Sequence, residues 1–163
     1  MSSVVRVVIE VNFPNYHIII VAGGKGLRMR ERLPKQFMPL GAGPFCVLQR
    51  TLMRFEAALP GIDKIVVIPE DYINMWKKLC EDAGFDLAHR VCAGGATRFH
   101  SVRNGLDLVA DDCDGVVGVH DGVRPFVSVD VIKKCFRTAQ SAGAVVPVLA
   151  SLESVRYGSV DRS

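Results

Sequence analysis

The sequence has little excess charge of either sign. Its 163 residues contain 20 Lys or Arg and 17 Asp or Glu, which leaves a formal net charge of only +3. Proteins that bind nucleic acid over a large surface usually have a pronounced excess of positive charge. We therefore expect no nucleic-acid partner, and we expect any basic function to be confined to one segment.

Long hydrophobic runs and closely spaced cysteines are also lacking. The longest apolar segments, such as HIIIVAGG at 17–24, are far shorter than the roughly 18 residues that a membrane span requires. The five cysteines lie 12 or more residues apart, at positions 46, 80, 92, 113 and 135. This spacing excludes a CxxC metal knuckle and disfavours a disulfide scaffold. We expect a cytoplasmic protein with reduced thiols and no membrane partner.

Five short aliphatic runs predict parallel strands that are buried on both faces, because they show no polar alternation. They occupy residues 17–22, 63–68, 87–92, 115–120 and 143–148. Apolar residues at helical spacing, which predict one buried stripe per helix, fall between these runs, at 45–59, 72–83, 99–109 and 129–139. The alternation predicts a single three-layer α/β/α domain with a mostly parallel twisted sheet over residues 17–150.

Residues 1–16 precede this domain as an N-terminal extension. Apolar residues alternate along it, but Glu10, Asn12 and Pro14 interrupt the alternation. No signal-peptide cleavage pattern follows. We interpret the extension as an appended strand or tail, to which the sequence assigns no function.

A glycine-rich basic loop follows the first predicted strand. The segment VAGGKGLRMRERLPKQF, residues 21–37, contains five Lys or Arg and one Glu. Glycine lets backbone N–H groups approach phosphate oxygens, whose charge the cations neutralise. A solvated surface loop does not need Gly23, Gly24 and Gly26 directly after a buried strand. The pattern therefore favours a polyphosphate-binding loop over a merely solvated one.

This loop matches neither of the two common nucleotide-binding patterns. No G-x-x-x-x-G-K-[ST] string occurs, which excludes a Walker A loop. A dinucleotide-binding turn requires a third small residue and a helix beginning on the loop. Met29 stands in place of the small residue, and Pro34 interrupts the segment soon afterwards.

Three ordered motifs resemble those of one nucleotidyltransferase family. They are AGGKGLRM with PKQF, GGATRFHSV, and VHDGVRP, and together they span about residues 17 to 151. They are similar to the A-[AG]-G-x-G-x-R-M…P-K-Q, G-x-x-R-x-x-S-V and H-D-x-x-R-P signatures of the 2-C-methyl-D-erythritol 4-phosphate cytidylyltransferases and their ribitol-5-phosphate relatives. The resemblance implies a Rossmann-like nucleotidyltransferase fold. It also implies that CTP and a sugar-alcohol phosphate react to give a CDP-linked product and pyrophosphate, in isoprenoid precursor synthesis.

The resemblance assigns roles to residues of the first two motifs. Arg28 and Lys35 would be the catalytic cations, because in-line phosphoryl chemistry depends on positioning and on neutralising oxygens that gain charge. The nucleotide-binding residues that it implies are Ala22, Gly23, Gly24, Gly26, Gly95, Ala96 and Ser101. Many relatives have an acidic residue where this chain has Ala96. For Ser101, a polar helix position near a cap is the structural alternative.

The third motif supplies candidates for the metal and the acceptor. By resemblance, Asp121 helps to hold Mg²⁺ or another divalent cation, which in proteins is usually bound by one or two carboxylates together with substrate phosphates. The alternative is that Asp121 only caps the turn before Arg124. The acceptor-binding residues that the resemblance implies are Arg124, Ser151 and Arg162. An ion pair with Asp121 is the alternative role for Arg124.

Residues 151–163 would begin a dimerisation arm, a β-arm that starts after residue 148. In relatives this arm reaches across a homodimer, so the resemblance implies a homodimer here. Family chains usually continue well beyond this point. Two other functions therefore stay open: a cytidylyltransferase for ribitol 5-phosphate or another sugar phosphate, and a nucleotide-binding module without turnover.

Overall fold

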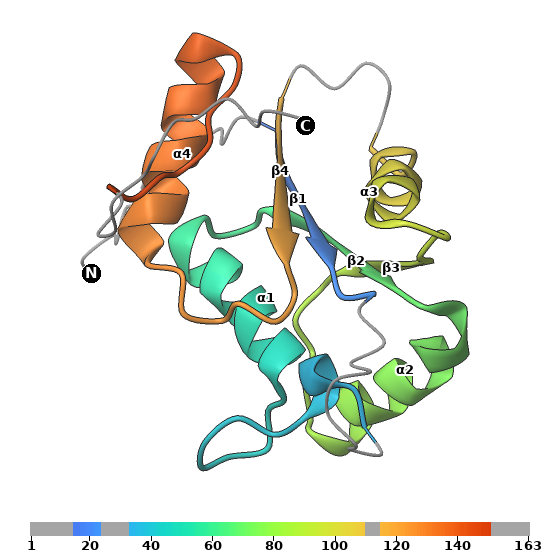
Figure 1. Cartoon of the computed structure of the whole chain (residues 1–163). Helices are drawn as coiled ribbons and strands as arrows, with labels where there is room; N and C mark the ends of the chain where they lie inside the picture. The colour runs from blue at the N-terminus through green and yellow to red at the C-terminus, as the bar shows by residue number, and fades with distance from the viewer. Residues whose placement is uncertain (1–14, 24–32, 110–114, 151–163) are drawn as a thin grey trace, which may run out of the picture.

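The computed structural model describes residues 15–23, 33–109 and 115–150 (Figure 1). The strands are β1 (Tyr16–Val21), β2 (Asp63–Ile68), β3 (Arg90–Ala93) and β4 (Val116–Asp121). The α-helices are α1 (Val47–Ala58), α2 (Ile73–Asp82), α3 (Arg98–Leu106) and α4 (Val129–Ala142), and two short 3₁₀ helices are η1 (Lys35–Phe37) and η2 (Glu70–Tyr72). None of the helices in these ranges is long and apolar enough to cross a membrane.

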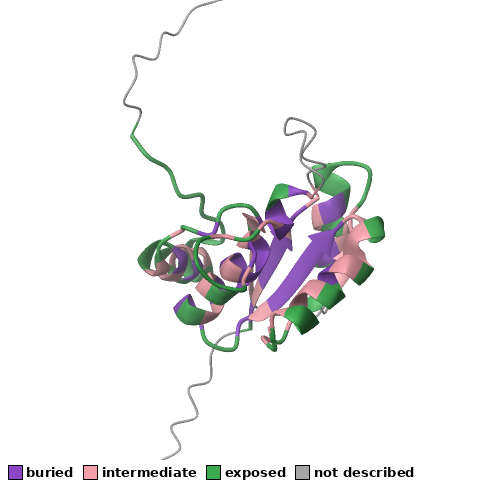
Figure 2. Ribbon diagram, turned by 90° about the horizontal axis from the view of Figure 1, so that it is seen from below, coloured by how far each residue is buried: buried purple, intermediate pink, exposed green. Residues whose placement is uncertain are grey.

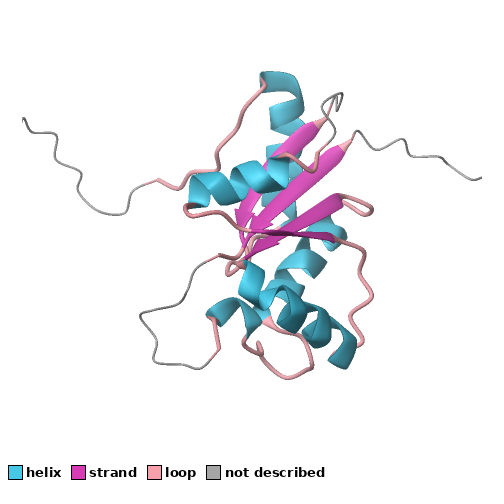
Figure 3. Ribbon diagram, turned by 90° about the vertical axis from the view of Figure 1, so that its right-hand side faces the viewer, coloured by secondary structure: helices cyan, strands magenta, loops and turns pink. Residues whose placement is uncertain are grey.

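The four strands form one parallel sheet in the order β3-β2-β1-β4. Figure 3 shows the strands side by side with helices on both sides of the sheet. The chain moves from β1 to β2 and β3 in one direction, and then returns past β1 to place β4 on its other side. The carboxyl ends of β1 and β4 therefore flank the point where the strand order reverses.

The core has two parts because alternate residues of each strand face opposite sides of the sheet. On one side, Ile18 and Ile20 of β1 pack with side chains of α1, α2 and α4. On the other side, Ile19 packs with Ile65 and Val67, and α3 covers this face. Burial on both faces explains the unalternating apolar runs of β1 and β2, the two central strands, whose residues are mostly buried (Figure 2). The predicted three-layer α/β fold with a parallel sheet is confirmed.

The predicted fifth strand, at residues 143–148, is wrong. Helix α4 ends at Ala142, the following Gly143 turns the chain with a φ of +82°, and residues 144–150 adopt no strand. Val146 and Val148 are 78% and 84% exposed. A strand requires a neighbouring backbone for its hydrogen bonds, and β4 has β1 as its one neighbour among the described strands. The aliphatic composition of a segment does not reveal whether a neighbouring strand is available to it.

Candidate active site

The candidate site lies at the carboxyl edge of the sheet, where the loops after β1, β3 and β4 meet. Val21, at the end of β1, pairs with Val67 of β2 and with Asp121 of β4, so these strand ends lie level. The strand order reverses between β1 and β4. In open parallel sheets, ligands bind in the crevice at this reversal. The topology therefore brings the first and third sequence motifs to one place.

Two glycine-rich loops converge on the hydroxyl of Ser101. This side chain is 4% exposed. Its Oγ accepts a hydrogen bond from the Gly95 N–H (3.1 Å) and donates one to the Thr97 carbonyl (3.0 Å). A Cβ added at Gly23 would lie 4.0 Å from this Oγ, and one added at Gly94 would lie 3.1 Å from it. The structure thus brings the first and second motifs together at a place where their glycines contribute no side chains.

The second loop is held tightly against the start of α3. Thr97 caps this helix, since its hydroxyl accepts a hydrogen bond from the His100 N–H at 3.3 Å. A Cβ added at Gly95 would lie 2.4 Å from the Cβ of His100 and 3.1 Å from its carbonyl carbon. Only glycine fits this close approach. Gly95 and its neighbour Ala96 are both exposed, so a ligand can reach their backbone.

The predicted catalytic Lys35 is exposed on a firmly anchored turn. It begins η1, between the buried Pro34 and the buried Gln36. The Gln36 side chain is buried among protein atoms at 2% exposure. Its Nε2 donates a hydrogen bond of 2.8 Å to the carbonyl of Ala22, directly after β1. The ammonium group therefore extends from a turn that is tied to the first loop.

Gln36 anchors the turn that carries Lys35, a contact that the sequence reasoning missed. The amide links η1 to Ala22, whose own N–H donates a 2.8 Å hydrogen bond to the carbonyl of Val67. The sequence does contain a signal for this residue, because Gln36 is the last residue of the PKQ string in the first motif. Only the fold reveals that this amide points inward.

Two arginines hold the carboxylate of Asp121. The guanidinium of Arg98 lies 3.1 Å from Oδ1, and Nε of Arg124 lies 2.9 Å from Oδ2. Partial burial raises the pKa of Asp121, but the hydrogen bonds and positive charge of Arg98 and Arg124 outweigh it and leave that pKa below its usual value. The ion pair expected as the alternative role of Arg124 is confirmed. The sequence analysis did not predict Arg98 at this carboxylate.

These ion pairs are exposed enough to exchange partners. The side chains of Arg98 and Arg124 are 61% and 72% exposed, against 35% for Asp121. Exposed pairs of this kind contribute at most about 1 kcal/mol. A phosphate group could therefore draw either guanidinium away from Asp121 at small cost.

Asp121 can contribute a single carboxylate to a metal ion that is carried by phosphates. Within the described ranges, no group of three or more His, Cys, Asp or Glu residues could hold a metal. A single carboxylate does not bind Mg²⁺ alone, but Mg²⁺ commonly uses one or two carboxylates, substrate phosphates and water. Asp121 fits that role as the protein ligand of a metal–triphosphate complex.

Five of the predicted site residues lie outside the described residues. They are Gly24, Gly26, Arg28, Ser151 and Arg162. Their assigned roles rest on the resemblance alone. The predicted residues that are described, apart from two that lie in helices, belong to loops or strand ends at the carboxyl edge of the sheet: Ala22, Gly23, Gly95, Ala96, Asp121 and Arg124. Lys35 begins η1, which Gln36 ties to Ala22, and Ser101 lies in the first turn of α3.

Comparison with known sequences tests the family directly. A sequence model of the 2-C-methyl-D-erythritol 4-phosphate cytidylyltransferase family matches residues 16–162. The chain belongs to this family. The match begins at the first residue of β1, so it includes all of the described strands and helices.

This chain is similar to curated cytidylyltransferases and to a protein of known crystal structure. The 2-C-methyl-D-erythritol 4-phosphate cytidylyltransferase of Bacteroides fragilis is 52% identical over 139 residues, which cover 85% of this chain and 62% of that one. The Phocaeicola vulgatus enzyme is 52% identical over 143 residues, covering 88% of this chain and 64% of that one. The crystal structure of 4-diphosphocytidyl-2C-methyl-D-erythritol synthase from Anaerococcus prevotii is 30% identical with a TM-score of 0.61, covering 78% of this chain and 51% of that one.

The chain thus spans less than two thirds of the length of these relatives. The matched part contains all three motifs of the sequence analysis.

Proposed function

We propose that the protein transfers a cytidylyl group from CTP to 2-C-methyl-D-erythritol 4-phosphate, as a step of isoprenoid precursor synthesis. The observation that carries this proposal is the meeting of two glycine loops at Ser101 beside the end of β1, where the strand order reverses. Family membership supports the same reaction.

The proposed chemistry needs no nucleophile from the protein. A phosphate oxygen of the acceptor attacks the α-phosphorus of CTP, and the bond from that phosphorus to the bridging oxygen breaks to release pyrophosphate. Oxygens around the phosphorus gain charge in the transition state, so fixed cations accelerate the step. We assign this role to Lys35 on its anchored turn and to Arg28. Arginine can grip two phosphate oxygens at once, whereas lysine supplies a compact charge.

The hydrogen bonds of Ser101 favour cytosine over uracil. Its O–H donates to the Thr97 carbonyl, and one lone pair accepts from the Gly95 N–H. The remaining lone pair of Oγ can only accept a hydrogen bond. The exocyclic amino group of cytosine is a donor, while uracil has an acceptor carbonyl at that position. Base choice would therefore rest on Ser101 and the loop backbone rather than on an acidic side chain at Ala96.

We also propose the finer assignments that follow from the resemblance. Asp121 would hold Mg²⁺ or another divalent cation together with the triphosphate, and such an ion neutralises phosphate charge. Arg124, once released from Asp121, would bind the acceptor phosphate with Ser151 and Arg162. The protein would act as a homodimer in the cytoplasm.

Two alanine variants test the proposed roles. Arg28→Ala and Lys35→Ala should each lower kcat by about 100-fold, because each removes a cation that acts mainly in the transition state. CTP affinity, measured by calorimetry, should change less than about fivefold, since uniform binding is not their main task. Lys77→Ala, an exposed lysine on α2, is the matched control and should change neither value. Equal losses of affinity and rate would contradict the proposed mechanism.

A further inference from the structure

The turn that carries Asp121 and Arg124 is fixed to the protein at Gly122. The N–H of Gly122 donates a 2.8 Å hydrogen bond to the carbonyl of Val21 at the end of β1. The N–H of Arg124 donates to the carbonyl of Asp121 at 3.1 Å, within the turn itself. Gly122 is buried, whereas Arg124 is exposed. Contacts at Gly122 therefore decide where the turn lies.

Gly122 packs between β1 and α1 with no room for a side chain. A Cβ added there would lie 2.7 Å from the Cβ of Ala22 and 3.0 Å from Cδ1 of Leu48. Only glycine permits this close approach of the backbone. Because the residue is buried, its N–H and carbonyl both need partners within the protein.

The hydroxyl of Thr51 on α1 is the partner of the Gly122 carbonyl. Thr51 is fully buried, with 0% of its surface exposed. Its Oγ1 donates to the Gly122 carbonyl at 2.9 Å and lies 3.0 Å from the carbonyl of Val47. The Val47 carbonyl already accepts the N–H of Thr51 in the regular α-helical pattern. The Gly122 carbonyl has no other donor among the described residues, so it depends on this hydroxyl.

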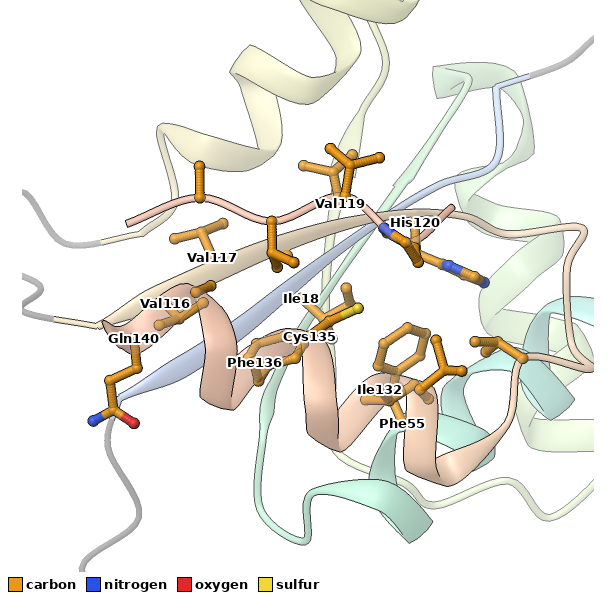
Figure 4. Close-up of a pocket in the computed structure, with 18 of the residues that line it drawn as sticks. Ile18, Phe55, Val116, Val117, Val119, His120, Ile132, Cys135, Phe136 and Gln140 are labelled. Carbon is orange, nitrogen blue, oxygen red and sulfur yellow. The ribbon is translucent and has the colours of Figure 1, made fainter. Parts of the chain in front are cut away.

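The next turn of α1 supports the other end of the same turn. Phe55 lies four residues after Thr51 and therefore on the same face of the helix. Its ring contacts the ring of His120 edge-on, with centroids 5.0 Å apart (Figure 4). Nε2 of His120 lies 3.0 Å from the carbonyl of Arg124, which can only accept, so the imidazole donates to it. One face of α1 thus supports the turn directly at Gly122 and indirectly at Arg124.

We propose that Thr51 is a positioning residue for the transfer reaction, acting through the carbonyl of Gly122. Asp121 and Arg124 flank this carbonyl in the chain, so its hydrogen bond fixes where both charged side chains begin. The proposal rests on the proposed function, which assigns the metal–triphosphate complex to Asp121 and the acceptor phosphate to Arg124. A misplacement of about 1 Å can slow a reaction about 100-fold, even when its cause lies away from the reacting atoms.

The ion pairs of Asp121 cannot provide this positioning. The side chains of Arg98 and Arg124 are 61% and 72% exposed, and exposed ion pairs are weak. They must also open when phosphate oxygens take their place. The hydrogen bond between Thr51 and Gly122 is buried and uses no group that a substrate would bind. It therefore persists while the charged side chains change partners.

Thr51→Val tests the role of the hydroxyl, because valine keeps the shape of the side chain and removes its donor. In the full chain, kcat/KM for the acceptor should fall at least about tenfold. CTP affinity, measured by calorimetry, should stay within about twofold, because the hydrogen bonds of Ser101 that fix the Gly95 loop do not involve Thr51.

Two further variants serve as rescue and control. Thr51→Ser keeps the hydroxyl and should restore kcat/KM to within about threefold of the native value. Thr138→Val makes the same chemical change on α4, which carries none of the proposed site residues, and should change neither quantity. Equal losses of CTP affinity and acceptor kcat/KM in Thr51→Val would overturn the proposal. A Thr51→Ser chain as impaired as the Thr51→Val chain would do the same.

Hydrogen exchange tests the positioning without any turnover. In Thr51→Val, the exchange rate of the Gly122 amide, divided by that of the Ile65 amide in β2, should rise at least about fivefold. A general loss of stability would accelerate both amides alike, so an unchanged ratio would overturn the proposal whatever the activity of the native chain. A raised ratio together with a native chain that releases no pyrophosphate would contradict the proposed function and would still support the anchoring of the turn by Thr51.

Discussion

Replacing the buried hydroxyl at the junction of the two glycine loops should destabilise the protein measurably. Ser101→Ala removes the Oγ that accepts the Gly95 N–H at 3.1 Å and donates to the Thr97 carbonyl at 3.0 Å. The Thr97 carbonyl keeps the backbone N–H of Ser101 as a donor at 3.0 Å. The Gly95 N–H loses its partner within the protein. The loss therefore falls mainly on one backbone donor at the site.

The expected loss of stability follows from these hydrogen bonds. An unsatisfied backbone donor costs about 1–3 kcal/mol when fully buried, and the exposure of Gly95 moves the value to the lower part of that range. We expect the free energy of unfolding to fall by about 1–2 kcal/mol. For a chain of this size that corresponds to a Tm lower by roughly 2–8 °C. CTP affinity should fall as well, because the loop that would hold the base is no longer fixed.

Chemical denaturation and CTP titration of matched variants provide the assay. Ser141→Ala is the control, because Ser141 also lies in a helix and donates to the Thr138 carbonyl at 3.1 Å, but it is exposed. Its unfolding free energy should stay within about 0.5 kcal/mol of the native value. If Ser101→Ala were no more destabilising than Ser141→Ala, the reasoning that Ser101 fixes the loop would be refuted.

Three further predictions concern other parts of the fold. Gly105→Ala should lower the free energy of unfolding, measured by urea denaturation, by about 1–3 kcal/mol, because the added methyl would lie 2.7 Å from Ile19. An unchanged denaturation midpoint would contradict close packing of α3 against the sheet. Partial burial raises the pKa of Asp63, but hydrogen bonds and charge, chiefly from Arg90, hold it below its ordinary value of 3.8. The stabilisation is therefore complete above that value and lost as the pH falls through the lower folded pKa, so Asp63→Asn should weaken the acid dependence of unfolding, and an unaltered pH profile would argue against it. Burial raises the pKa of Cys80 to about 11, so mass spectrometry should find its alkylation at about pH 8 much slower than that of free cysteine; equal rates would be inconsistent with this.

The sequence predicts the four strands that pair in the described sheet, and it wrongly predicts a fifth strand at residues 143–148. Residues 63–68 are β2 in both prediction and structure, because they lie inside the sheet with both faces packed. Residues 143–148 have the same aliphatic composition but adopt no strand. Hydrogen bonding to a neighbour depends on tertiary structure, and local composition carries no information about it.

The candidate site was likewise predicted only in part. Gly95 and Asp121 were identified from motifs, and both lie at the carboxyl edge of the sheet. The anchoring of Lys35 by Gln36 and the second guanidinium on Asp121, from Arg98, were not predicted. These contacts join segments far apart in the chain, so only the assembled fold specifies them.

Pyrophosphate release tests the proposed cytidylyl transfer most directly. In the presence of Mg²⁺, we expect release that requires both CTP and 2-C-methyl-D-erythritol 4-phosphate and that is slower when UTP or GTP replaces CTP. Faster release with ribitol 5-phosphate would contradict the proposed acceptor. Binding of CTP without release for any sugar phosphate would indicate a nucleotide-binding module and would contradict the proposed enzyme activity.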